Sequence, residues 1–161
     1  MAANQERDFY RQAASLLAGA RTGTLATISG GAPHAALVTP ALGADGAPIL
    51  LLSELSAHTR HLRANPACAL LITGAPSDEN PQTAPRILLS GIAQPTDDTD
   101  AANRFLKTHS YAKLYSGFGD FHFWRLIPDG AHYVGGFAAA ATLEIAALQH
   151  EIIHILGKAA G

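Results

Sequence analysis

Five side chains that can donate hydrogen bonds lie within eight residues of one another in LLLSELSAHTRHLRANP, residues 50–66. They are Ser53, Ser56, His58, Thr59 and Arg60. The pattern predicts a strand that ends at Ser53 and a helix over 56–65, stopped by Pro66. The first turn of a helix has unpaired amides and a partial positive charge, and an arginine can bind a phosphate through two parallel hydrogen bonds. The segment is therefore typical of an anion site, although an ordinary serine-capped surface helix has the same residue types.

A second pattern with chemical meaning is His150-Glu151-Ile152-Ile153-His154, which reads HExxH. On a helix the two imidazoles fall on one face, as in zinc proteases. The position of a third metal ligand holds Ala160, so we reject a protease. We interpret this segment as a packing helix that carries two histidines. Haem ligation by His150 or His154 is the alternative, because neutral imidazole is a common haem ligand.

Composition limits the class of protein. The chain has 161 residues, 48% of them hydrophobic and 15% charged, which fits one globular domain. The net charge of -2 and the lack of long charge runs exclude nucleic-acid binding. No apolar run is long enough for a membrane span, and Glu6, Arg7 and Asp8 do not fit a signal peptide. The single cysteine, Cys68, is expected to be a core thiol, and we expect a cytoplasmic protein.

The elements that must position these residues are mostly short strands. Strands are expected at 23–29, 33–41, 48–53, 67–73, 86–93, 121–127 and 131–137. Tight turns are expected at Gly30-Gly31, Asp45-Gly46 and Pro128–Gly130, and an exposed loop at 74–85. Helices are expected at 5–19, at 56–65, after an N-cap at Thr96, and from about Leu143. This order favours a mainly β (α+β) fold, an antiparallel barrel with flanking helices. We expect a barrel domain over 1–142 and a helical tail over 143–161.

Four stretches carry a family resemblance: ARTGTLATISGGAPHAALVTPAL, LLLSELSAHTRHLRANP, PRILLSGIAQ and GFGDFHFWRLIPDGAHYVGGFAAA. Over residues 7–140 the chain resembles the pyridoxamine 5′-phosphate oxidase-like FMN-binding split barrels, and more closely their HugZ-type haem-utilisation branch. The resemblance implies an FMN phosphate at Ser53–Arg60 and a flavin ring along Ala36, Leu37 and Val38. It also implies a homodimer with FMN at the interface, and gives Arg86 a place near the flavin. From the residues alone, Arg86 is a solvated edge charge.

The chain departs from the true oxidases at the positions that hold their substrate. Ala36 and Ala41 stand where the oxidases have an arginine and a lysine, and Ala57 and His58 replace an Arg-Lys pair. We therefore expect a flavin site without a vitamin B6 substrate. The leading hypothesis is an FMN-dependent oxidoreductase acting on an unknown small molecule, with no catalytic residue assigned. The alternatives are a haem-binding or haem-degrading protein, a non-catalytic flavin module, and a reductase that uses deazaflavin F420. The tail ALQHEIIHILG resembles the start of an extra C-terminal domain of longer HugZ-type proteins.

Overall fold

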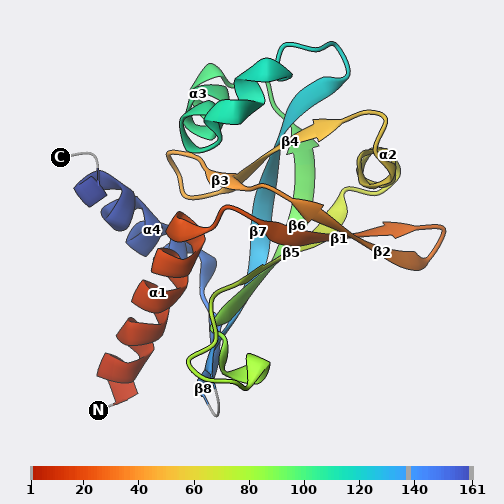
Figure 1. The fold of residues 1–161 in the computed structure, drawn as a ribbon. Helices are drawn as coiled ribbons and strands as arrows, with labels where there is room; N and C mark the ends of the chain where they lie inside the picture. Colours follow the sequence, from red (N-terminus) through yellow and green to blue (C-terminus); the bar gives the residue numbers. More distant parts are fainter. Residues whose placement is uncertain (1, 137–138, 160–161) are drawn as a thin grey trace.

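Within residues 2–136 and 139–159, which the computed structural model describes, eight strands form one antiparallel sheet (Figure 1). The strands are β1 (Gly23–Ser29), β2 (Ala32–Val38), β3 (Ala41–Leu42), β4 (Pro48–Ser53), β5 (Ala67–Thr73), β6 (Arg86–Pro95), β7 (Phe121–Gly136) and β8 (Ala139–Leu143). Neighbours follow the order β2-β1-β5-β6-β7-β4-β3, and β8 pairs with the second half of β7. The predicted antiparallel β architecture with flanking helices is confirmed.

The first hairpin follows directly from local sequence. Gly30 and Gly31 both have positive φ, 56° and 80°, which is the backbone of a tight two-residue turn that L side chains rarely adopt. The turn sets the register, so that Thr27 on β1 lies opposite His34 on β2. Residues opposite each other in an antiparallel pair share one face of the sheet. Thr27 and His34 therefore point to the same side.

The course of β7 differs from what the sequence predicted. The predicted turn at Pro128–Gly130 does not reverse the chain, because residues 121–136 form one strand that pairs with β6 along its length. The register shifts there: Gly91 faces Pro128 and Ser90 faces Gly130, so Asp129 is an extra residue on β7. A Cβ on Gly91 would lie 2.1 Å from the Ile127 carbonyl oxygen, and only glycine allows this approach. The end of the predicted strand at Phe137 lies outside the described residues, and β8 was not expected.

The helices in the described chain are α1 (Ala2–Gly19), α2 (Ala57–Ala64), α3 (Thr99–Thr108) and α4 (Ile145–Ala159). Two short 3-10 turns, η1 (Pro81–Thr83) and η2 (Ser110–Leu114), complete the list. The expected N-cap of α3 at Thr96 is wrong. The Thr96 amide donates to the Phe123 carbonyl and stays with the sheet, so Asp98 caps the helix by accepting from the Asp100 amide.

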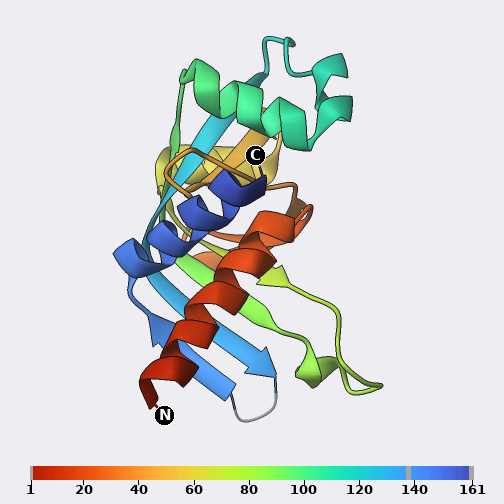
Figure 2. The same cartoon turned by 90° about the vertical axis from the view of Figure 1, so that its left-hand side faces the viewer.

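The main core lies between the sheet and two helices. α1 and α4 run side by side along one side of the sheet, and α2 lies at its opposite end (Figure 1, Figure 2). Leu148 and Ile152 of α4 are buried in the same core as Leu25 and Leu70 of the sheet. The division of the chain at residue 142 stays a prediction, but α4 is packed as part of this core. A smaller cluster around Phe105 joins α3 to β3 and β4.

None of the helices in residues 2–136 and 139–159 combines the length and hydropathy needed to cross a bilayer.

Candidate functional site

An open hollow of about 210 Å³ lies where β2 and β4 end and α2 begins. It is lined by Leu37, Val38, Thr39, Leu51, Leu52, Ser53, Ser56, His58 and Phe121. Five of the predicted cofactor residues therefore meet here, from two segments of the chain: Leu37, Val38, Ser53, Ser56 and His58. Five of the nine lining residues are apolar, and three of the four polar ones, Ser53, Ser56 and His58, lie at or just before the start of α2. Such a hollow suits the edge of a flat apolar molecule that carries one polar end.

The remaining predicted residues lie elsewhere. Ala36 precedes Leu37 on β2 and is half-buried. Thr59 is 0% exposed, and its hydroxyl has no hydrogen-bond partner among the described residues. Arg60 is exposed and donates from Nη1 to the Leu55 carbonyl at 2.7 Å. Arg86 donates from Nη1 to the carbonyls of Gln82 and Ala84, both at 3.1 Å. The hollow thus has no arginine in its lining.

Asp120 is the site residue that sequence analysis missed. Ser53 Oγ donates to Asp120 Oδ2 at 2.7 Å and accepts from the Leu55 amide at 3.1 Å. The Glu54 amide also donates to the Asp120 carbonyl at 2.7 Å. The two residues are brought together by the pairing of β4 with β7, in which Ser53 faces Phe121. Since Ser53 and Asp120 are 67 residues apart, only that strand pairing could have revealed the contact.

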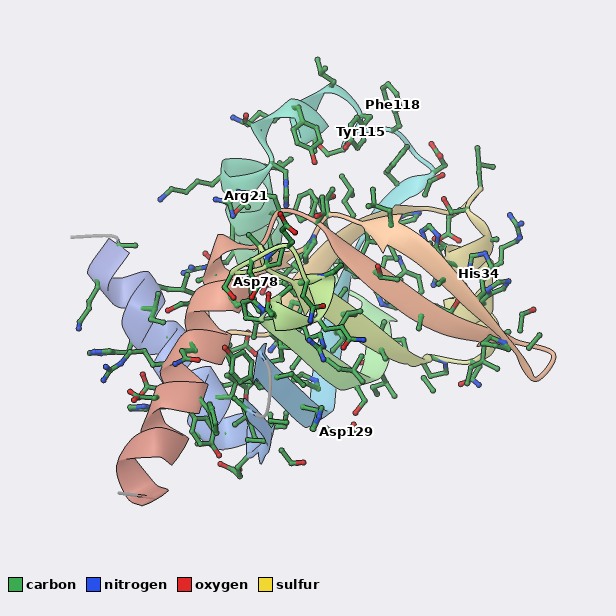
Figure 3. All side chains as sticks on the ribbon, turned by 60° about the horizontal axis from the view of Figure 1, so that its bottom comes forward. Arg21, His34, Asp78, Tyr115, Phe118 and Asp129 are labelled. Carbon is green, nitrogen blue, oxygen red and sulfur yellow. The ribbon has the colours of Figure 1, made fainter. Side chains whose placement is uncertain are left out.

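Three histidines, His34, His58 and His61, lie beside the hollow, where α2 packs against the β1–β2 hairpin. The rings of His34 and His61 lie edge to face, and Thr27 Oγ1 is 3.0 Å from His61 Nδ1. Figure 3 shows His34 on the hairpin beside α2. Burial lowers the pKa of His58, and the neighbouring His34 and His61 lower it further. His58 therefore faces the hollow as a neutral imidazole at neutral pH.

The first turn of α2 completes the polar end of the hollow. Ser56 has the extended backbone of an N-cap, φ −77° and ψ 141°, but its side chain makes no capping bond within the described chain. Amides at a helix start that lack a capping side chain can bind an anionic or carbonyl oxygen of a ligand. The two candidate haem ligands of the tail are not part of this hollow. His150 and His154 are exposed on α4, which packs on α1 at the other side of the sheet.

Neither a preformed metal centre nor a reactive thiol is found in the described part of the chain. No three of its His, Cys, Asp or Glu side chains are placed to share a metal ion. Burial, with a smaller effect of Asp129, raises the pKa of the Cys68 thiol to about 11. A thiol with such a pKa is almost fully protonated at neutral pH and is a poor nucleophile.

Comparison with known proteins decides the family. Residues 9–135 match the family model described as pyridoxamine 5′-phosphate oxidase. The chain belongs to the pyridoxamine 5′-phosphate oxidase family. A curated relative, the chloroplastic non-canonical heme oxygenase HOZ of Arabidopsis thaliana, is 40% identical over 132 residues. That match covers 78% of this chain and 40% of the relative, so the chain spans less than half of the relative's length.

Solved structures share the fold of this chain. A heme binding protein from Mycobacterium smegmatis superposes with a TM-score of 0.81 at 28% identity, covering 88% of this chain and 60% of that one. ChuZ of Campylobacter jejuni superposes with a TM-score of 0.71 at 18% identity, over 81% of this chain and 56% of the other. The likeness to ChuZ shows the fold alone. The predicted resemblance to the haem-utilisation branch of this family is confirmed.

Proposed function

We propose that this chain is a haem-binding protein of the pyridoxamine 5′-phosphate oxidase family, with haem as its substrate or cargo. The observation that carries the proposal is the hollow bordered by Leu37 and Phe121, in which apolar side chains lie beside the hydrogen-bonding side chains of Ser53, Ser56 and His58. Haem combines a flat apolar ring with carboxylate side chains, and the hollow offers a partner for each. The 40% identity to a relative named a heme oxygenase favours haem over other flat molecules.

The residues of the hollow divide between the two parts of haem. Leu37, Val38 and Phe121 would pack against the ring, and Ser56 and the first amides of α2 would bind a propionate. Haem supplies the iron centre for any oxygen chemistry. The chain's own residues bind the ring, exclude water from one side of it and orient the carboxylate. Ligation of the iron by His150 or His154 stays a prediction, and because α4 lies away from the hollow it would require a second copy of the chain.

The proposed assembly is a homodimer that covers an apolar face of the sheet. Thr24 pairs with Leu37 and Leu71, and Leu71 pairs with Leu88, so these side chains share one face. The exposed apolar residues of this face are Ile28, Leu37, Leu88 and Ile127. Leu37 is 76% exposed although it lines the hollow. A second copy on this face would bury Leu37 and close the hollow from outside.

A haemin titration followed by absorption tests the proposal. Saturable binding with a shifted and sharpened Soret band is the expected result, together with at least about tenfold weaker binding by Phe121→Ala, since a large aromatic contact is lost. The matched control is Phe118→Ala, an exposed phenylalanine three residues away that does not line the hollow. Its affinity should remain unchanged. Binding that never saturates, or that both variants weaken equally, would contradict the proposal.

Loss of the Soret shift in His150→Ala or His154→Ala would identify the iron ligand.

FMN is the second candidate. In its favour, the first turn of α2 is uncapped, and its amides could donate hydrogen bonds to a phosphate. Against it, the Asp120 carboxylate is hydrogen-bonded to Ser53 in the lining of the hollow and would repel a phosphate dianion. A flavin-dependent oxidoreductase and a flavin-storage module would both follow from such binding. Quenching of flavin fluorescence on titration with the protein measures this candidate independently of haem.

A further inference from the structure

We propose that Asp120 is a specificity-determining residue, which makes the start of α2 reject a dianionic phosphate ester and accept an uncharged or singly charged group. The inference rests on the proposed function in one respect, namely that the hollow at Ser53 and His58 is the ligand site. It goes beyond that function because it states which ligands are refused. The observation behind it is the hydrogen bond from Ser53 Oγ to Asp120 Oδ2, 2.7 Å long.

The first step concerns the Ser53 hydroxyl. A serine hydroxyl has one proton to donate, and Ser53 gives it to Asp120 while its oxygen accepts from the Leu55 amide. A phosphate oxygen is an acceptor and needs donors. Ser53 could donate to it only by giving up the bond to the Asp120 carboxylate, so the new bond would replace an existing charge-assisted one. The residue that looks like a phosphate donor in the sequence is therefore already engaged.

The second step concerns charge. Asp120 is joined to the lining of the hollow through Ser53, and in the described chain no cation forms an ion pair with it. Neither Ala57 nor His58 adds a positive charge at the start of α2, because the lowered pKa of His58 leaves its ring neutral at pH 7. Arg60 is turned to the Leu55 carbonyl on the exposed side. A carboxylate without a partner cation repels a dianion about twice as strongly as a monoanion.

The third step names the chemical class. A phosphate monoester brings two negative charges close to Asp120, whereas a carboxylate brings one and a hydroxyl brings none. The hollow should then accept a planar molecule with a carboxylate or hydroxyl end. Haem propionate and the ribityl chain of riboflavin meet this condition, and FMN does not.

A pair of flavins tests this selectivity without haem. Riboflavin and FMN share the ring and differ in the phosphate, so the ratio of their dissociation constants isolates the effect of charge. Wild type should bind FMN no more tightly than riboflavin at low salt. Asp120→Asn keeps an acceptor for Ser53 and removes the charge, so it should bind FMN at least about tenfold more tightly than wild type. Its affinity for riboflavin should change by less than about twofold.

The chain offers a matched control. Asp129 also accepts a hydrogen bond from a serine, Ser90, at 3.3 Å. It lies at the opposite end of the molecule from Phe118, which is two residues from Asp120 (Figure 3). Asp129→Asn should leave both flavin affinities unchanged. A wild type that binds FMN more than about tenfold better than riboflavin overturns the proposal, and so does an Asp120→Asn variant with no gain for FMN. Failure to bind haemin would overturn the proposed function and leave this comparison intact.

Discussion

The imidazoles of His34 and His61 meet edge to face, with ring centroids 4.8 Å apart and ring planes at 83°. This contact joins the β1–β2 hairpin to α2, and therefore joins two of the segments that line the hollow. His61 is held in place by Thr27, and His58 lies one helical turn before it on α2. Burial and these two neighbouring imidazoles lower the pKa of His58, so a proton on its ring is disfavoured at this position.

The free energy of unfolding should fall as the pH falls below about 6.5, in part through His58. Its pKa is lowered from 6.5 in the folded chain by burial and by His34 and His61. As the pH falls, His58 therefore takes up a proton in the unfolded chain at a higher pH than in the folded chain. The contribution of neutral His58 to stability is complete above pH 6.5, and it is lost as the pH falls through the pKa that His58 has in the folded chain. Denaturation of wild type and His58→Gln at pH 7.5 and 5.5 measures this contribution to the free energy of unfolding. The variant should lose less stability on acidification, and His150→Gln on the exposed face of α4 should behave as wild type.

Gly91→Ala should destabilise the fold by about 2–4 kcal/mol, because the added methyl group collides with the backbone of β7. A Cβ at this position would lie 2.1 Å from the Ile127 carbonyl oxygen and 2.9 Å from the Pro128 Cα. Gly117→Ala is the control, since within the described chain no atom lies within 4 Å of its added Cβ. That change should stay within about 0.5 kcal/mol. Urea denaturation of the two variants checks both values, and equal effects would show that β6 and β7 are not tightly packed around the extra residue Asp129.

Two adjacent isoleucines of α4 test whether this helix belongs to the core. Ile152 is 1% exposed and Ile153 is 46% exposed. Ile152→Ala should cost about 2–5 kcal/mol, because it opens a cavity against Gly46 and the sheet. Ile153→Ala should cost less than about 1 kcal/mol, since it removes surface that is partly in water already. Similar small losses in both variants would instead support an independent tail over residues 143–161.

Local sequence was enough to predict several elements to the residue. The bounds expected for β1, β4 and β5 agree with the structure, because glycine, proline and polar turns mark both ends of each run. The turn predicted at Pro128–Gly130 is wrong for a reason of tertiary structure. Its residues are typical of a turn, but β6 pairs on both sides of them and holds the chain straight around one extra residue. β8 is a run of alanines before Thr142, which carries little strand signal.

The candidate site was predictable as a segment but not as a set of contacts. Position along the chain placed Ser53, Ser56 and His58 near one another, and the structure brings them to one hollow. Thr59 could not join them, because it lies one helical turn before Leu62 and faces the core with it. The contact of Asp120 with Ser53 could not be predicted, because it depends on the pairing of strands that are 67 residues apart in the sequence. Helix periodicity could have predicted that Thr59 is buried, whereas the contact between Asp120 and Ser53 could be found only from the fold.

Leu37→Glu should prevent the proposed homodimer. Leu37 is 76% exposed on the apolar sheet face, and a second copy placed there would bring two glutamates into an apolar interface without partners. Leu114→Glu is a matched control, because Leu114 is 80% exposed on η2, which is not part of that face. Sedimentation at several protein concentrations should show a dimer for wild type and Leu114→Glu, and a monomer for Leu37→Glu. Because Leu37 also lines the hollow, the monomeric variant should bind haemin more weakly as well. A dimer that survives Leu37→Glu would place the interface on another surface.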